Sequence, residues 1–378
     1  MKRLKTVVLV LLVLAALLAF AAWLVLRSPG FGGTPEGARL ERMRQSPQFI
    51  GGRFENTPPY ISNMSVLGEL KAFMGEQVRE PTFAVPVLAM AGADLVRLPQ
   101  AGLRAWWLGH ASVLIEIDGL RILTDPVFSE RTSPFQFVGP SRLHPAPLAL
   151  AEWKNIDAVV ISHDHFDHLD RDTIRHLARG GSHFYVGLGI GAHLQRWAVP
   201  AAQIHEMDWW DQLTIKGVAI HCTPARHYSG RKSMDNSTLW SSWMIKGPRH
   251  SAWFSGDTGY AGHFKQIRER LGAPELALIK IGAYGDTWLD IHMNPEAAVQ
   301  AHKDLGATTM LPVHWATFNL AYHDWAEPMV RAVAASRAEG VQLISPRVGE
   351  KFEFGVPFEN RAWYRQPVPA PDEKQRKP

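Results

Sequence analysis

The chain has 378 residues, of which 46% are hydrophobic and 20% charged, and this is ordinary globular composition. Its formal net charge of +4 is mild, and no Lys/Arg stripe interleaved with aromatic residues appears, so no nucleic-acid partner is expected. The single cysteine, Cys222, excludes an intrachain disulfide and a cysteine-based zinc site.

The N-terminus carries a long apolar run behind three cations in the first five residues. The uncharged stretch from Thr6 to Leu26, at about 1.5 Å per residue, spans roughly 31 Å, the thickness of a bilayer core. We therefore expect residues 1–28 to be a membrane anchor. The excess of cations before the run predicts a single-pass inner-membrane protein with the rest of the chain on the periplasmic side. A cleaved signal peptide, with residues 19–21 as its small-x-small site, stays open as the alternative.

Three further segments follow the anchor. Residues 29–102 begin rich in Gly, Pro and Arg and predict a linker and loose N-terminal extension, with helical periodicity over 61–80. Residues 103–355 predict one folded domain of strands and helices. The tail over 356–378 is Pro-rich and charged, and we expect it to be partly disordered.

The folded domain is expected to be α/β. Short apolar runs predict strands over 104–108, 112–117, 120–124, 156–161, 183–186, 218–223, 241–245, 251–255, 276–281 and 309–313. Asp118-Gly119 predicts a two-residue hairpin turn. Helical patterns fall over 171–179, 190–198, 260–271, 295–305 and 324–339. Sheets covered by helices, with a site along one edge, follow from this mixture.

The segment Ile161-Ser-His-Asp-His-Phe-Asp-His-Leu-Asp170 concentrates potential metal ligands. It reads as H-x-H-x-D-H, with His163, His165, Asp167 and His168 as the reactive side chains. Neutral imidazoles suit zinc, iron and similar metals, and a carboxylate compensates their charge. A histidine-rich surface loop or a single structural metal site is the competing interpretation. The position directly after a buried strand favours a functional loop.

Three more candidate ligands, His227, Asp257 and His314, each follow a predicted strand. Taken alone, a histidine after a strand is more often a hydrogen-bonded loop residue, and an aspartate between glycines usually stabilises a turn. Because they follow H-x-H-x-D-H in this order, we favour their interpretation as metal ligands. The order H-x-H-x-D-H, then His, then Asp, then His resembles the metallo-β-lactamase superfamily over about residues 103–350.

Within that superfamily the chain resembles the branch of N-acylphosphatidylethanolamine-hydrolysing phospholipase D. The residues that carry this resemblance include Gly109-His-Ala-Ser112, Leu123-Thr-Asp-Pro126, Ser133-Pro-Phe-Gln-Phe-Val-Gly-Pro140, Ile281-Gly-Ala-Tyr284, His292-Met-Asn-Pro-Glu-Ala-Ala-Val299 and His314-Trp-Ala-Thr-Phe318. The resemblance implies an αβ/βα sandwich with two metal ions between two sheets at one edge.

The resemblance also implies residue roles. One zinc ion is expected on His163, His165 and His227, and a second on Asp167, His168 and His314, with Asp257 bridging the pair. Iron or manganese in place of zinc stays open. Asp257 and His292 are the expected catalytic residues, and His110 and Asp125 are expected to orient ligands. The expected substrate contacts are Gln136, Phe137, Phe166 and His292.

The implied activity is a membrane-associated phosphodiesterase that cleaves N-acylphosphatidylethanolamine-like lipids by metal-activated hydroxide. The partners are then a phospholipid substrate and the membrane, with a homodimer as an open question. Two alternatives remain: a lactonase or other carboxylic-ester hydrolase with the same metals, and a catalytically silent metal-binding scaffold at the membrane. The sequence contains no G-x-S-x-G motif, so it offers no sign of the serine nucleophile of an α/β-hydrolase.

Overall fold

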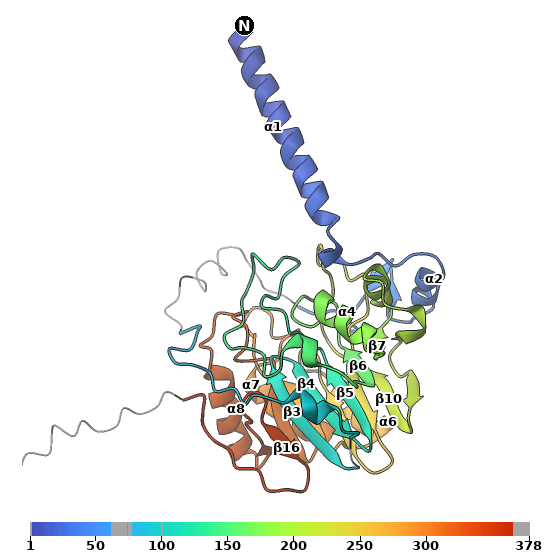
Figure 1. Cartoon of the computed structure of the whole chain (residues 1–378), viewed down its shortest axis with the longest axis vertical. Helices are drawn as coiled ribbons and strands as arrows, with labels where there is room; N and C mark the ends of the chain where they lie inside the picture. Colours follow the sequence, from blue (N-terminus) through green and yellow to red (C-terminus); the bar gives the residue numbers. More distant parts are fainter. Residues whose placement is uncertain (1, 62–73, 75–77, 100, 366–378) are drawn as a thin grey trace, which may run out of the picture.

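Two seven-stranded sheets form the body of the protein in the computed structural model, which describes residues 2–61, 74, 78–99 and 101–365 (Figure 1). The first sheet has the order β16-β3-β4-β5-β6-β7-β8 and the second β15-β14-β13-β12-β11-β10-β9. The first sheet comprises β3 (Leu103–Gly109), β4 (Ser112–Ile117), β5 (Leu120–Thr124), β6 (Ala158–Ile161), β7 (His183–Gly187), β8 (Ile204–Met207) and β16 (Lys351–Glu353). The second comprises β9 (Gln212–Ile215), β10 (Val218–Thr223), β11 (Ser242–Lys246), β12 (Ser251–Phe254), β13 (Leu276–Lys280), β14 (Thr309–Val313) and β15 (Gln342–Leu343).

Helices cover the outer faces of both sheets. The helices of the body are α2 (Ala38–Arg44), α4 (Arg171–Arg179), α5 (Gly191–Arg196), α6 (His263–Leu271), α7 (Pro295–Leu305) and α8 (Glu327–Ala338). The N-terminal helix α1 (Lys2–Leu26) lies apart from both sheets (Figure 1). Side chains alternate along the strands: in β6, Ala158 and Val160 join the core between the sheets, while Val159 and Ile161 pack toward α4. The expected αβ/βα sandwich is therefore confirmed.

Local sequence signals explain several elements. Asp118 and Gly119 both have positive φ, 48° and 92°, as a two-residue hairpin turn between β4 and β5 requires. Asp170 caps α4 by accepting a hydrogen bond from the Asp172 backbone N–H. Asn294 caps α7 in the same way, and Gly306 ends it in the left-handed conformation. The predicted ranges 171–179 and 295–305 are confirmed.

The strands β8 and β9 escaped the sequence prediction. Each is the last strand of its sheet, and β9 is mostly exposed. Edge strands that face water lack the apolar alternation by which strands are recognised, which explains the omission.

Residues 29–60 are packed on the body, contrary to the expectation of a loose linker. They include β1 (Phe49–Ile50) and β2 (Arg53–Phe54). Phe54 is fully buried in a cluster with Leu188 and Trp240, and Asn56 donates a hydrogen bond of 2.7 Å to the backbone carbonyl of His227. A few buried side chains thus outweigh the Gly- and Pro-rich composition. Most of the helical pattern predicted over 61–80 lies outside the described residues.

The start of the tail is also packed. Trp363 stacks on Trp315 with ring centroids 5.1 Å apart, and Tyr364 is buried in the main core. Trp315 in turn stacks on Trp107 of β3 at 5.4 Å. The tail that we expected to be partly disordered therefore continues the fold through residue 365, and residues 366–378 lie outside the described part.

The N-terminal helix α1 stands away from the body (Figure 1). Lys5–Leu26 is long and apolar enough to cross a membrane by length and composition, and none of its best apolar window is buried. An exposed apolar helix of this kind is consistent with a membrane anchor or a signal sequence.

Buried histidines make the stability of the fold depend on pH. Burial lowers the pKa of His263 to about 3 and the pKa values of His144 and His302 to about 4. The unfolded chain binds protons at these residues below about pH 6.5 and the native chain does not, so stability falls as the pH drops from about 6.5 toward 4. Thermal unfolding at several pH values should show this loss, and His263→Gln should make the slope shallower. An unchanged slope in that variant would contradict the assignment.

Candidate metal centre

All seven predicted metal ligands lie in loops that directly follow strands. The H-x-H-x-D-H segment follows β6 of the first sheet, while His227, Asp257 and His314 follow β10, β12 and β14 of the second. The structure brings these loops together at one edge of the sandwich. His314 has a φ of 66°, in the left-handed region that non-glycine residues adopt uncommonly.

The first group of donors comprises His163, His165 and His227. His163 Nε2 lies 2.8 Å from His165 Nδ1, which lies 3.4 Å from His227 Nε2. Ligand atoms 2.0–2.1 Å from a tetrahedral ion are themselves about 3.3 Å apart, so these spacings approach those of three ligands of one ion.

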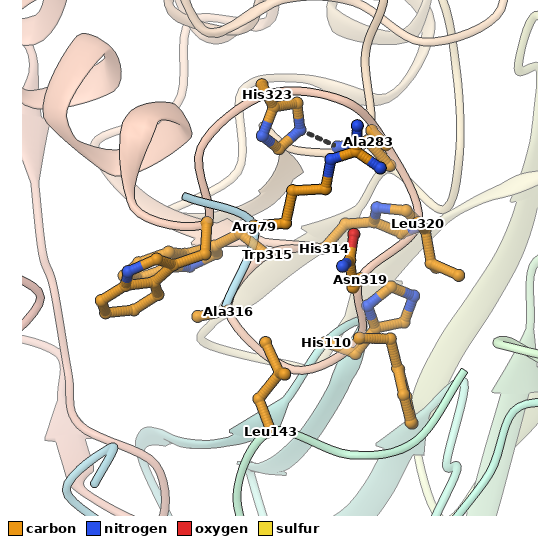
Figure 2. A pocket seen from close by; sticks show the side chains of 13 residues that line it. Arg79, His110, Leu143, Ala283, His314, Trp315, Ala316, Asn319, Leu320 and His323 are labelled. Atoms are coloured by element: carbon orange, nitrogen blue, oxygen red, sulfur yellow. Dashed lines mark hydrogen bonds between the residues drawn. The ribbon is translucent and has the colours of Figure 1, made fainter. Parts of the chain in front are cut away.

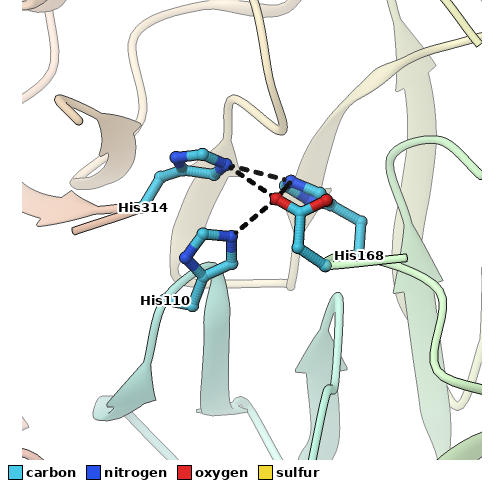
Figure 3. A group of neighbouring side chains, drawn as sticks. His110, His168 and His314 are labelled. Atoms are coloured by element: carbon cyan, nitrogen blue, oxygen red, sulfur yellow. Dashed lines mark hydrogen bonds and ion pairs between the residues drawn. The ribbon is translucent and has the colours of Figure 1, made fainter. Parts of the chain in front are cut away.

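The second group comprises Asp167, His168 and His314. The Nε2 atoms of His168 and His314 lie 3.1 Å apart, and each is 3.3 Å from Asp167 Oδ2. Figure 3 shows the rings of His168 and His314, and that of His110, turned toward this carboxylate. These atoms have the spacing of a second ion site.

Asp257 lies between the two groups. Its Oδ2 atom is 3.3 Å from His168 Nε2 and 3.9 Å from His227 Nε2, while its Oδ1 atom is 3.1 Å from His314 Nε2. The side chain is 2% exposed. A carboxylate that reaches donors of both groups is positioned to bridge two ions.

Hydrogen bonds on the far side of the rings direct nitrogen lone pairs into the centre. Asp125 Oδ2 accepts from His168 Nδ1 at 2.6 Å and from the Ser162 hydroxyl, and the Ser162 oxygen lies 2.9 Å from His163 Nδ1. The Ile291 carbonyl holds His227 Nδ1 at 3.0 Å. Acceptors behind the rings leave each Nε2 as a lone pair, which is how proteins orient metal-binding imidazoles. Lone pairs that face one another at these distances fit a cation between them.

Electrostatics also favour bound cations. Burial lowers the pKa values of His163 and His227 well below the usual value, so both are in the neutral form that binds metals. Although burial opposes ionisation, His314 and His168 hold the pKa of Asp257 well below its usual range. Although burial opposes it, the carboxylates of Asp257, Asp167 and Asp125 hold the pKa of His168 well above its usual value. These buried carboxylates therefore favour positive charge at the centre, which a divalent metal with borderline ligand preference would supply.

His110 lies behind the second group. Its Nε2 atom is 2.9 Å from Asp167 Oδ2, and its backbone N–H donates to the Thr317 hydroxyl at 2.6 Å. His110 lines a narrow cavity of about 20 Å³ together with Arg79 and His314. Figure 2 shows the side chains around it. We expected His110 to orient the imidazole of a ligand, whereas its ring contacts the carboxylate of Asp167.

A larger pocket of about 560 Å³ opens over the metal ligands. His165, Asp167, Asp257, His292 and His314 form its polar floor. Its walls carry larger and mostly apolar side chains, namely Arg79, Tyr228, Trp288, Ile291, Leu320 and Tyr322. A polar floor under apolar walls suits an amphiphilic molecule.

The predicted substrate contacts are divided between two places. His292 lines the metal pocket with its Nε2 atom 3.8 Å from Asp257 Oδ2. Gln136, Phe137 and Phe166 line a separate hollow of about 250 Å³ next to Ser28. The ring of Phe166 lies under the guanidinium of Arg231 at 4.0 Å and does not line the metal pocket.

Sequence reasoning missed several lining residues. Tyr228 follows ligand His227 directly, so its proximity could have been inferred from that neighbour. Arg79 comes from the N-terminal extension and carries no local signal for its place in the pocket. Trp288 and Leu320 depend on loops whose paths only the structure shows.

Comparisons with known proteins agree with this geometry. The family model described as beta-lactamase superfamily domain matches residues 120–315, and the site has the metal-binding form of that fold. The chain belongs to the metallo-β-lactamase superfamily, in the branch similar to N-acylphosphatidylethanolamine-hydrolysing phospholipase D.

Three relatives show the extent of the likeness. An uncharacterized protein of Mycobacterium tuberculosis is 44% identical over 93% of this chain and 96% of its own length. The N-acyl-phosphatidylethanolamine-hydrolyzing phospholipase D 1 of Caenorhabditis elegans is 37% identical over 58% of this chain and 65% of its own length. The mitochondrial N-acyl-phosphatidylethanolamine-hydrolyzing phospholipase D of Saccharomyces cerevisiae is 34% identical over 59% of this chain and 49% of its own length. The alignments to these two named lipases thus span about two thirds and about half of their lengths.

Among solved structures, the metallo hydrolase Igni18 of Ignicoccus hospitalis has a TM-score of 0.53 and 25% identity. The superposition covers 67% of this chain and 99% of the Igni18 chain. The isothiocyanate hydrolase from Delia radicum gut bacteria has a TM-score of 0.54 at 19% identity, over 66% of this chain and 98% of its own, which shows a shared fold alone. The protein is therefore a metallo-hydrolase by family and by donor set.

Proposed function

We propose that the protein is a membrane-associated di-zinc phosphodiesterase of the phospholipase D type. Its substrates are N-acylphosphatidylethanolamine-like lipids, which it hydrolyses to phosphatidic acid and an N-acylethanolamine. The observation that carries the proposal is the pair of donor groups sharing Asp257 at the floor of a pocket with apolar walls. The named lipases among the relatives support the same substrate class.

The donor groups would hold two zinc ions, with His163, His165 and His227 on one, Asp167, His168 and His314 on the other, and Asp257 on both. Such a pair, when bound, lowers the pKa of water and neutralises charge on a phosphoryl group. The walls of the pocket hold the apolar chains, and burial of the floor limits entry of bulk water.

His292 is the candidate for contact with the reacting phosphodiester. Burial, helped by the cation of Lys280, holds the pKa of His292 well below its usual value, so the ring is neutral. Its Nδ1 atom has no hydrogen-bond partner among the described residues. A neutral imidazole at the pocket floor can donate a hydrogen bond to a phosphoryl oxygen or to the leaving oxygen of the ethanolamine.

We propose that α1 anchors this site at the membrane where its substrate resides. The apolar stretch of α1 supports a single span, and the cations before it support a cytoplasmic N-terminus with the sandwich on the periplasmic side. A cleaved, secreted form is the alternative. The intact mass of the purified protein distinguishes them.

The experiment that tests the function is turnover by the full-length, zinc-loaded protein in detergent. We expect cleavage of a fluorescent N-acylphosphatidylethanolamine between phosphate and ethanolamine, along with hydrolysis of bis(p-nitrophenyl) phosphate. Hydrolysis of the simple diester without the lipid would contradict the lipid assignment. Activity on lactones and on neither phosphodiester would contradict the phosphodiesterase.

Replacing His292 with asparagine should lower kcat on the lipid by about 10²-fold, because a positioned proton donor contributes roughly 10²–10⁴-fold. The zinc content should stay at two per chain, since His292 is assigned to neither ion. Metal analysis beside the kinetics checks this. Loss of zinc in the variant would instead make His292 a ligand, and unchanged kcat would remove it from the reaction.

A further inference from the structure

A second pocket of about 590 Å³ lies where α1 joins the body. It is lined by the end of α1, by the segment that follows, by α2 and α5, and by Lys232. Figure 1 shows that α1 meets the body on the side of α2 and α4. We call this hollow the α1-foot pocket. Its long side chains are Leu26, Arg27, Glu36, Arg39, Gln195, Arg196 and Lys232.

The α1-foot pocket carries an excess of positive charge. Arg39 is paired with Glu206 at 2.6 Å, but Arg27, Arg196 and Lys232 form no ion pair with any described residue. Glu36 is the one acidic side chain of the lining. These three cations and Glu36 are all exposed, and together they give the lining a net positive charge. Because the three cations have no ion-pair partner among the described residues, an anionic ligand can pair with them.

The pocket lies at the height where the apolar run ends. Leu26 is the last residue of α1, and Arg27 lies over the ring of Trp23 at 4.1 Å. Tryptophan and arginine at the end of an apolar helix are typical of the membrane–water interface, where phosphates of lipid headgroups are found. A ligand in this pocket would therefore be held at the headgroup level.

A neighbouring loop presents apolar side chains at the same place. Phe137 and Val138 are 82% and 52% exposed. Ring contacts connect this loop to the foot of α1, since Phe31 packs on Phe135 at 6.1 Å and Phe135 stacks on Phe137 at 5.3 Å. Exposed apolar residues beside unpaired cations fit a surface that lies against a lipid bilayer.

We propose that the α1-foot pocket binds the phosphate headgroup of an anionic phospholipid of the surrounding membrane. Arg27, Arg196 and Lys232 contact the headgroup, while Phe137 and Val138 dip among the acyl chains. The inference requires α1 to be in the membrane but does not require lipid hydrolysis. The bound lipid fixes the tilt of the sandwich, and thereby the approach of the metal pocket to the bilayer.

The test uses full-length protein in mixed micelles doped with phosphatidylglycerol or phosphatidylcholine, with lipid binding read by native mass spectrometry. We expect phosphatidylglycerol to bind at least about 10-fold more tightly. The double variant Arg196→Gln/Lys232→Gln should weaken it by roughly 25-fold, at about 5-fold for each charge at the surface. Lys265→Gln, which removes an exposed cation of α6, is the matched control and should bind as the wild type does.

Equal binding of the two lipids, or unchanged binding in the double variant, would overturn the proposal. Inorganic phosphate that displaces the lipid at millimolar concentration would assign the pocket to free anions and overturn it as well. The double variant should hydrolyse bis(p-nitrophenyl) phosphate normally. Because binding is measured apart from turnover, a protein that hydrolyses no lipid can still pass this test.

Discussion

Replacing Asp257 with asparagine is expected to lower kcat/KM on bis(p-nitrophenyl) phosphate by about 10³-fold. Loss of a preorganised electrostatic group lowers the rate by roughly 10²–10³-fold, and the weaker binding of the metal ions adds to this effect. Asparagine keeps the shape of the side chain but removes the negative charge that faces His168, His227 and His314. At least one equivalent of metal should be lost. Metal analysis of the dialysed protein and steady-state kinetics measure both effects.

The matched control is Asp172→Asn. Asp172 lies in the first turn of α4, and its side chain is 47% exposed. This variant should retain two metal ions and wild-type kinetics. Retention of both metals and full activity in the Asp257 variant would refute a bridging role for that carboxylate.

Replacing Arg231 with methionine is expected to destabilise the protein by about 3 kcal/mol, because buried hydrogen-bond acceptors are left unpaired. The guanidinium is buried and donates to the carbonyl of Gly30 at 2.8 Å, of Asp164 at 2.7 Å and of Leu169 at 3.0 Å. The second and third carbonyls belong to the metal-binding loop and its end. Zinc affinity should therefore fall together with the melting temperature.

Differential scanning calorimetry and zinc titration with a competing chelator measure the two effects. The control is Arg175→Met, which removes an exposed cation of α4 and should change neither quantity. A variant of Arg231 that melts lower but binds zinc normally would show that the bonds to Asp164 and Leu169 do not hold the loop in its ligating form.

Contiguous signals made the metal loop predictable. Four ligand-type residues within six positions stand out against any background, and the strand before them sets where they lie. The helix α7 was predictable for the same reason, since Asn294, Pro295 and Gly306 mark its ends. These signals depend on residues that are neighbours in the chain.

Long-range packing made the rest unpredictable. Phe166 lies within the metal-binding motif, yet Arg231 and Phe31 hold its ring away from the metal pocket. Phe54 and Asn56 read as parts of a linker until their partners across the fold are known. The side chain of Arg79 reaches the pocket from a segment with no ligand pattern. In each case the partner lies far away in the sequence.

The two donor groups draw their members from both sheets. The first group takes His163 and His165 from the first sheet and His227 from the second, and the second group is divided in the same manner. Neither half of the sandwich can hold an ion in full coordination by itself. Metal affinity is therefore also a gauge of how firmly the halves are joined. During unfolding, the sheets cannot separate while the metal stays fully coordinated, and during synthesis the site can close only after β14 and His314 have emerged.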